Sequence, residues 1–558
     1  MVSVSVVSSL AAGYQYSAPC CVVTFQRTNR NKNTRAKKTA KKTTRARAAK
    51  NSSWPSEQAR KTAFSTAPVE QKNVAAVVRN GLLPSWLNGC FYRNGPGTFE
   101  NGTEEGMLHL ADGYGMVVKI DIRGRENAAT ISNSFVKSNA YEEYKKNGKM
   151  TWREFGTPKQ VDGIGERIVD VVRTILRSVG IGQGMIWTDN ASVHVIPRVD
   201  DLWAMAETVD GTFRIDKETL ETKGRVLFHD DLDGKLTTAH PLVLEDGTLI
   251  NLISIIGKGF VVYSCDETNI RKKIAYIPHR RPMSPSWIHD FPGNKEYVVI
   301  PEMPFYFNLA SLMFGTKGTH LFLDWIPEYK TRLHVIEVST GAVHTVDADP
   351  FFVFHWANAF TSGNHLHLDA TVYDTPDIVQ HYFLDTVKHG TSELPKSHLR
   401  RLTLEKKPNG SFSVVPAEDG SSWHRLSDDE TRDFGDFTDF PTVATRGEKH
   451  RYVWLSAAVR PTNFTNALVK FDTETSSSIY WHEEGALPGE PCFVPAPSGA
   501  KDNEDDGVIL SMLTEASGES SLLILNARDM KEHCRISCNI PISSGFHGSF
   551  VPHSFSGI

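Results

Sequence analysis

Short runs of β-branched, aromatic and aliphatic residues recur along most of this 558-residue chain, and they constrain its fold more than any other feature. They have the length of strands, and turn residues (Gly, Pro, Asn and Asp) separate them from Leu82 onward. We therefore predict one large all-β domain. A β-propeller fits best, because radially packed small sheets use many strands without long exposed edges. No repeat consensus is visible, so we expect diverged blades. Examples of the runs are 248–253, 260–263, 297–300, 333–338, 365–370, 452–455, 467–471, 507–512 and 521–525.

Charge is distributed unevenly along the chain, and the first 50 residues differ from the rest. They hold eleven Lys and Arg and no acidic residue, which leaves 50 basic against 65 acidic residues beyond them, a net charge of −15. The stretch opens with small and hydroxylated residues and becomes basic and Thr/Ala-rich from Lys37. This composition is typical of an organelle transit peptide, and the order favours a plastid. The alternative is a basic tail that binds nucleic acid or anionic lipid. The acidic body argues against a nucleic-acid surface.

Three segments are expected along the chain. Residues 1–50 are predicted to be a plastid transit peptide, 51–75 a disordered polar lead-in, and 76–558 a single β-propeller domain. Five cysteines remain beyond the first segment, an odd number that indicates reduced, structural thiols rather than a disulfide framework. No run of about 18 uncharged apolar residues occurs, so we expect no single membrane-spanning helix.

Two apolar segments interrupt the β pattern. The first has apolar residues at helical spacing with arginines between them, which predicts one apolar helix face. The second, Phe305 to Phe314, is too short to span a bilayer. Both segments are compatible with ordinary core packing, or with a patch that dips into one lipid leaflet near the entrance for a membrane-dissolved substrate. The apolar positions of the first segment are Ile168, Val171, Val172, Ile175, Leu176 and Val179.

Four of the 21 histidines stand out by their surroundings: His240, His289, His355 and His547. They are separated by 49, 66 and 192 residues, unlike the ligands of local metal sites. Only a fold that brings distant strands to one axis can join them, and a propeller does so. Neutral imidazoles bind divalent first-row metals well and leave the metal its full charge. The set therefore predicts a metal centre with open positions.

Metal-bound imidazoles need their second nitrogen fixed, often by a carboxylate. Glu207, Asp439 and Glu490 lie in largely apolar contexts and are candidates for this role. The chain has no Gly-x-Ser-x-Gly, no nucleotide-binding glycine loop and no His-Glu-x-x-His. We therefore predict no catalytic residue beyond the metal ligands. The turn-rich motif 91–97 is interpreted as structural.

Ordered motifs from Leu82 to Phe550 resemble the carotenoid cleavage dioxygenase family, which also includes retinal-forming oxygenases and the visual-cycle isomerase. The resemblance implies a seven-bladed propeller with a helical cap over the active-site face. It implies one Fe(II) per chain on the propeller axis, O2 as co-substrate and a hydrophobic apocarotenoid substrate. The four histidines match the family's iron ligands, and the three acids match the carboxylates behind them. The motifs are 88–97, 109–116, 188–207, 239–241, 289–291, 354–359, 489–491 and 546–548.

Two positions depart from the family pattern. Thr361 follows Phe360 where the family usually has a glutamate after an aromatic residue, and Asp439 is one methylene shorter than the usual glutamate. Three stretches, 138–146, 285–304 and 493–508, are most similar to the branch that forms carlactone in strigolactone biosynthesis. That similarity implies conversion of 9-cis-β-apo-10'-carotenal and O2 to carlactone. From the transit-peptide composition and the two apolar segments we expect a location in the plastid stroma with peripheral membrane contact.

Other functions remain open at this stage. Another family member would make apocarotenals by simple cleavage, and an isomerase of the same fold would consume no oxygen. A non-catalytic propeller would be an interaction platform with buried, hydrogen-bonded histidines and no iron. A calcium-dependent propeller hydrolase would need carboxylate and Asn ligands, which the histidine set disfavours.

Overall fold

The computed structural model describes residues 53–159, 188–314, 320–426, 436–497 and 503–553, together with Gly163, Gly165, Val169 and Val172. The predicted transit peptide lies outside the described residues. So does most of the helix predicted over 168–179; of its apolar positions only Val172 is described, and it is helical and exposed. No helix among the described residues is both long enough and apolar enough to cross a bilayer.

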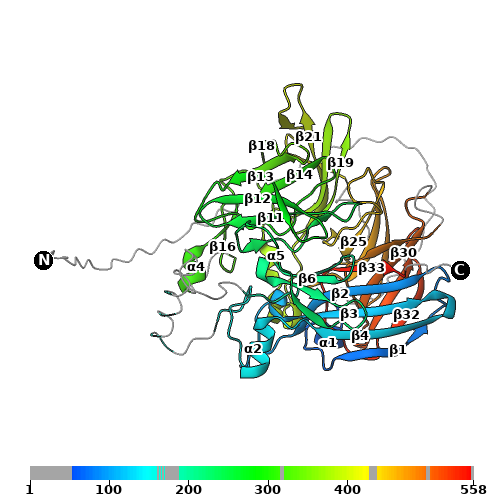
Figure 1. Cartoon of the computed structure of the whole chain (residues 1–558). Coiled ribbons are helices and arrows are strands. Elements are labelled where there is room, and N and C mark those ends of the chain that lie inside the picture. Colours follow the sequence, from blue (N-terminus) through cyan, green and yellow to red (C-terminus); the bar gives the residue numbers. More distant parts are fainter. Residues whose placement is uncertain are drawn as a thin grey trace, which may run out of the picture. The chain divides into compact units, whose positions relative to one another are not determined.

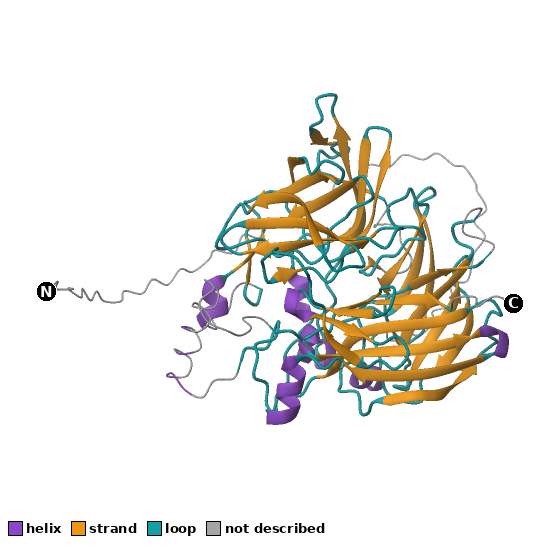
Figure 2. Cartoon of the chain, in the orientation of Figure 1, coloured by secondary structure: helices purple, strands orange, loops and turns teal. Residues whose placement is uncertain are grey.

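Strands dominate the described chain, as the sequence predicted (Figure 2). Five separate sheets contain three to five antiparallel strands each and follow one another along the chain, which is a propeller-like arrangement. The first contains β5 (His194–Pro197), β6 (Leu202–Met205), β7 (Thr212–Ile215) and β8 (Thr222–Arg225). The second contains β9 (Leu236–Thr237), β10 (Leu242–Val243), β11 (Leu249–Ile255), β12 (Gly259–Cys265) and β13 (Arg271–Pro278).

The third to fifth sheets continue this order. The third contains β14 (Tyr297–Glu302), β17 (Thr331–Glu337) and β18 (Val343–Ala348), with the hairpin of β15 (Phe305–Phe307) and β16 (Leu323–Trp325) inserted in its connection. The fourth contains β19 (Trp356–Ser362), β20 (His365–Val372), β21 (His398–Lys406), β22 (Phe412–Val414) and β23 (Trp423–Arg425). The fifth contains β24 (Asp436–Phe437), β25 (Tyr452–Ala458), β26 (Ala467–Asp472) and β27 (Ser477–His482).

A ten-stranded sheet joins the two ends of the described chain. Its order is β28-β30-β31-β32-β1-β4-β3-β2-β33, with β29 paired to β30 (Figure 1). Strand β1 pairs with β4 over Gln71–Ala76 and with β32 over Val77–Arg79, so it belongs to two ladders. The described strands therefore form five sheets of three to five strands, the two-stranded sheet of β15 and β16, and one ten-stranded sheet, rather than the seven separate blades expected. The strands of the ten-stranded sheet are β1 (Gln71–Arg79), β2 (Asn88–Thr98), β3 (Tyr114–Arg123), β4 (Ala128–Phe135), β28 (Leu487–Pro488), β29 (Cys492–Pro495), β30 (Gly507–Thr514), β31 (Ser520–Asn526), β32 (Glu532–Ser537) and β33 (Gly548–Pro552).

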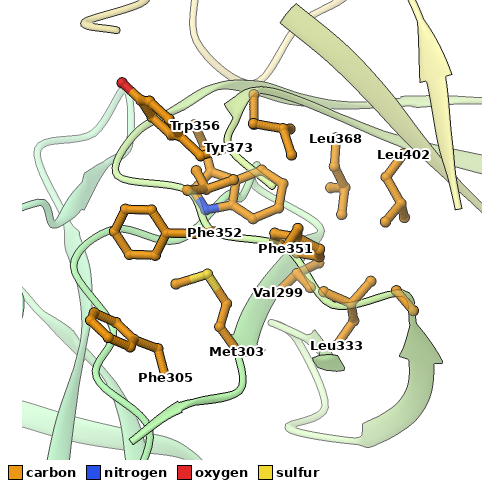
Figure 3. Packing of buried hydrophobic residues seen from close by; sticks show 14 of the residues in the cluster. Val299, Met303, Phe305, Leu333, Phe351, Phe352, Trp356, Leu368, Tyr373 and Leu402 are labelled. Carbon is orange, nitrogen blue, oxygen red and sulfur yellow. The ribbon is translucent and has the colours of Figure 1, made fainter. Parts of the chain in front are cut away.

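The largest apolar cluster fills the space between the third and fourth sheets (Figure 3). Val299 and Leu333 from one sheet face Leu368 and Leu402 from the other, because alternate residues of a strand point to the same face. The β15 hairpin adds Phe305–Phe307, whose side chains are at most 6% exposed. These first three residues of the apolar segment 305–314 are thus core, not a lipid-facing patch.

Helices are few and short in the described residues, so the expected helical cap is not evident from them. They are α1 (Glu57–Ala63), α2 (Asn139–Asn147), α4 (Leu309–Phe314), α5 (Asp377–His381) and α6 (Leu384–His389), besides three 3₁₀ turns, η1 (Leu110–Asp112), η2 (Gly124–Glu126) and η3 (Val209–Gly211). Figure 2 shows most helical turns beside the sheets rather than among their strands.

The lead-in predicted to be disordered over 51–75 is instead structured from α1 onward. The Ser56 hydroxyl accepts a hydrogen bond from the Ala59 N–H and caps the helix. Ala59, Ala63 and Phe64 lie on one side of α1 and are fully buried in a cluster with residues of α2 and α6. The small apolar side chains of this segment gave too weak a pattern to predict the helix.

Candidate metal centre

Four imidazoles converge at one point in the described structure. His240, His289, His355 and His547 each offer a ring nitrogen, and these nitrogens all lie within 4.8 Å of one another. The Nε2 atoms of His289 and His355 are 3.1 Å apart. Each side chain leaves a loop at the edge of a different sheet: His240 precedes β10, His289 precedes β14, His355 precedes β19 and His547 precedes β33. All four are buried, with at most 8% of each residue exposed.

Three of the four rings are oriented by carboxylates. His289 Nδ1 contacts Glu207 Oε1, His355 Nδ1 lies 2.9 Å from Asp439 Oδ1, and His547 Nδ1 lies 2.8 Å from Glu490 Oε1. A carboxylate can only accept, so each Nδ1 is the protonated donor and each Nε2 carries a free lone pair. Each acid lies two residues beyond the end of a short strand: β6, β24 and β28 respectively. This arrangement is the one that orients histidines toward a metal.

His240 is held differently. Its backbone N–H donates to Thr238 Oγ1 at 3.1 Å, and Thr238 in turn bonds to Asn251. Its Nε2 is buried, yet no described residue offers it a hydrogen-bond partner. A buried nitrogen without a partner costs free energy, and a bound cation would satisfy it. The residues present therefore fit a metal.

The electrostatics differ within the cluster: they favour the neutral imidazole, which is the ligand form, at His240 and His547, and act in the opposite direction at His355. Burial, with the neighbouring histidines, holds the pKa values of His240 and His547 well below their ordinary value. Burial also acts to lower the pKa of His355, but the Asp439 carboxylate outweighs it and raises that pKa. Burial raises the pKa of Glu490, although Arg93 opposes this.

Comparison with known proteins identifies the family. The model of the family named for the retinal pigment epithelial membrane protein matches residues 64–552. Carotenoid cleavage dioxygenase 8 homolog A, chloroplastic, from Oryza sativa subsp. japonica is 33% identical over 490 residues, covering 85% of this chain and 84% of that protein. This chain belongs to the carotenoid cleavage dioxygenase family. It is accordingly an enzyme of the dioxygenase type.

Further relatives span similar lengths. Carotenoid cleavage dioxygenase 8, chloroplastic, from Arabidopsis thaliana is 31% identical and covers 87% of this chain and 85% of its own length. Among solved structures, a variant of the Synechocystis apocarotenoid oxygenase matches with a TM-score of 0.74 at 24% identity, covering 90% of this chain and all of that one. That likeness shows that the propeller-like fold is shared.

Both departures from the family pattern can now be placed. Asp439 reaches His355 despite its shorter side chain, and its Oδ1 also accepts from Thr371 Oγ1 at 3.1 Å and from the Phe440 N–H at 3.0 Å. Thr361 lies on the exposed part of β19, where its hydroxyl accepts from Asn294 Nδ2 at 3.2 Å. It has no contact with the histidine cluster among its described interactions.

Two supporting residues were missed from the sequence. Arg93, in the motif interpreted as a structural turn, is 2% exposed; its guanidinium lies 2.8 Å from Glu490 Oε2 and donates to the Gly545 carbonyl. Trp287 donates from Nε1 to Glu207 Oε2 at 2.7 Å. A buried Arg within a strand needs an acidic partner, and that signal was present in the sequence.

Aromatic side chains border the histidines of this family member. The ring centroids of Phe354 and Trp287 lie 5.3 and 5.5 Å from the ring centroid of His289. The Phe440 ring stacks on His355 with a centroid distance of 5.1 Å. Phe440 has a φ of 53°, which is unusual for a bulky residue and persists only where the surroundings enforce it. These rings make the immediate neighbourhood of the cluster apolar.

Proposed function

We propose that this chain is a non-haem Fe(II) dioxygenase that cleaves a conjugated double bond of an apocarotenoid. In this proposal His240, His289, His355 and His547 hold the iron, and Glu207, Asp439 and Glu490 fix three of the rings. The observation that carries it is the convergence of four buried imidazoles, three of them backed by carboxylates and the fourth with an unpartnered Nε2.

Ferrous iron bound there would activate O2 and stabilise developing charge. The chain's own residues would orient the reactants. The carboxylates keep Nδ1 protonated and direct each Nε2 inward. Phe354, Trp287 and Phe440 exclude water and offer flat apolar surfaces for a polyene, so placement of one double bond near the cluster would choose the bond cut. We assign no protein group as a proton donor or nucleophile.

The finer proposal is carlactone formation from 9-cis-β-apo-10'-carotenal in the plastid. It is supported by the two relatives named carotenoid cleavage dioxygenase 8, both of which are also named chloroplastic. The transit-peptide composition of residues 1–50 agrees with that location. A member that makes apocarotenals by simple cleavage is the second candidate, supported by the 28% identity to the β,β-carotene 15,15'-dioxygenase of Rattus norvegicus.

The finer architecture is also proposed. In the ten-stranded sheet, strands β28 to β32 lie on one side of β1, and β4, β3, β2 and β33 lie on the other. If these two groups are counted as two blades joined through β1, they and the five separate sheets make seven blades. Peripheral membrane contact is proposed for the segment around Val169 and Val172, which are 46% and 48% exposed.

The test uses the full chain purified without oxygen. We expect one iron per chain, oxygen uptake with the apocarotenal and the mass of carlactone as product. His355→Ala should lose iron and uptake together, whereas His279→Ala, which removes a buried histidine outside the cluster, should keep both. Folded protein without iron would overturn the proposal and leave an interaction platform. Iron without oxygen uptake, but with a changed double-bond isomer, would indicate an isomerase.

A further inference from the structure

A second group of side chains that could bind a metal lies near the β33 edge of the ten-stranded sheet. Cys90, Asp121 and His553 each offer one ligand atom, and the three atoms lie within 4.8 Å of one another. Cys90 Sγ is 3.5 Å from His553 Nε2, which is 3.1 Å from Asp121 Oδ1. These residues are separate from the four-histidine cluster and play no part in the proposed function.

The sheet register explains why these residues meet. Cys90 on β2 pairs directly with Asp121 on β3 and with Val551 on β33. Cross-strand partners have their Cβ atoms about 4.5–5.5 Å apart on one face. His553 lies two residues beyond Val551 and so returns to that same face. Its backbone N–H donates to the Asn88 carbonyl at 3.2 Å, which fixes the chain there.

The separations match those around a tetrahedral zinc ion. With Zn–S near 2.3 Å and Zn–N and Zn–O near 2.0–2.1 Å, tetrahedral angles place sulfur and nitrogen about 3.5 Å apart and nitrogen and oxygen about 3.3 Å apart. The observed separations are 3.5 and 3.1 Å. Moreover, Asp121 Oδ1 is shielded from solvent and receives no hydrogen bond from the described residues, so its short approach to His553 lacks hydrogen-bond geometry.

We propose that Cys90, Asp121 and His553 bind one Zn²⁺, with water in the fourth position. A thiolate and a carboxylate would neutralise the dication, and thiolate, imidazole and carboxylate are all zinc ligands. Lys119, the nearest cation on this face, is already paired with Glu218 at 2.8 Å. His553 is 44% exposed at its side chain, which leaves a path for the ion.

Such a site would tie the last strand of the described chain to β2 and β3. Strand β33 begins directly after His547, so zinc at its far end would restrain the strand that carries one proposed iron ligand.

Cobalt provides the test, because only a thiolate ligand gives a near-ultraviolet sulfur-to-cobalt charge-transfer band. The full chain is stripped with chelator, kept reduced and titrated with Co²⁺. We expect the band in the natural chain and in His355→Ala, which disables the histidine cluster alone. It should vanish in Cys90→Ser and persist in Cys265→Ser, a matched control at a buried thiol.

His553→Ala distinguishes a ligand from a fold effect, because this exposed side chain can be removed without opening the core. Changes behind a ligand already weaken metal binding by about 10–100-fold, so loss of the ligand should weaken Zn²⁺ binding more than about tenfold. In chains that carry His355→Ala, so that the histidine cluster is disabled, Zn²⁺ should raise the Tm, and adding Cys90→Ser should abolish that rise. The absence of the cobalt band in the natural chain, or its survival in Cys90→Ser, would overturn the site.

Discussion

Carboxylates orient three of the histidine rings, and two of these carboxylates, Asp439 and Glu490, have further partners of their own. Asp439 is 2% exposed and accepts from Thr371 and from a backbone N–H besides contacting His355. Glu490 is shared between His547 and Arg93. An ionised carboxylate is tolerated in such a place only when it is paired or well hydrogen-bonded.

Asp439→Asn keeps the size of this side chain and removes its charge. The amide also offers His355 Nδ1 a weaker acceptor, so iron affinity should fall by about 10–100-fold. Iron retained during dialysis against graded chelator measures this. Asp472→Asn is the matched control, since that acid at the end of β26 pairs with Arg451, accepts from the Glu474 and Thr475 N–H groups and is not among the residues of the cluster. Equal retention in the two variants would contradict the role of Asp439.

Arg93→Ala leaves the Glu490 carboxylate buried without its cation. Breaking a buried pair costs about 3–5 kcal/mol in unfolding free energy, because one charge stays uncompensated. Denaturant unfolding should show this loss, and Glu490→Gln in the same chain should recover part of it. Lys272→Ala, at an exposed pair with Asp266, should cost less than about 1 kcal/mol. A similar small cost for Arg93→Ala would mean that water replaces the guanidinium.

At the scale of elements, β1 joins two ladders that would otherwise be separate. Its first part pairs with β4 and its last three residues with β32, near the other end of the chain. Val77 is 57% exposed, so its side chain contributes little to this contact. The backbone hydrogen bonds carry the connection, together with Val78, which packs against the apolar cluster that contains its β32 partner Ile536.

Replacing both Val77 and Val78 by proline tests this connection. Donors alternate between the two sides of a strand, so one of the two lost N–H groups faces β32. We expect the unfolding free energy to fall by about 1–3 kcal/mol per orphaned partner. The double change to threonine keeps the donors and should stay near the natural value. Equal stability of the two variants would show that the β1–β32 ladder is dispensable.

At the scale of the whole molecule, the histidine cluster connects loops from four sheets. These loops precede β10, β14, β19 and β33. Consecutive ligands are separated by as many as 192 residues along the chain, and the first and last, His240 and His547, by 307. An ion bound by all four restrains segments that the covalent chain leaves independent. It binds the folded state only, because the unfolded chain does not bring these residues together.

Iron removal should therefore destabilise the fold. Free Fe(II) at 100 times its Kd should raise the unfolding free energy by about 2.7 kcal/mol. Thermal unfolding without oxygen, with Fe(II) or with chelator, should show a higher Tm in iron for the natural chain. His289→Ala should show no such difference. The same shift in His289→Ala would mean that iron acts elsewhere on the molecule.

The sequence by itself determined the β-rich class, the family and the four histidines, because strand-length patterns and ordered motifs are local properties of the chain. Motif order also selected Glu207, Asp439 and Glu490, and the structure places each beside a histidine ring.

Only the tertiary structure decided the rest. It placed Arg93 beside Glu490 across 397 residues, Cys90 beside His553 across 463, and Phe305–Phe307 in the core rather than at a surface. The tertiary structure also buries one side of α1 and pairs β1 with both β4 and β32. Periodicity reports which face of a segment is apolar, whereas register and burial depend on what distant segments pack against it.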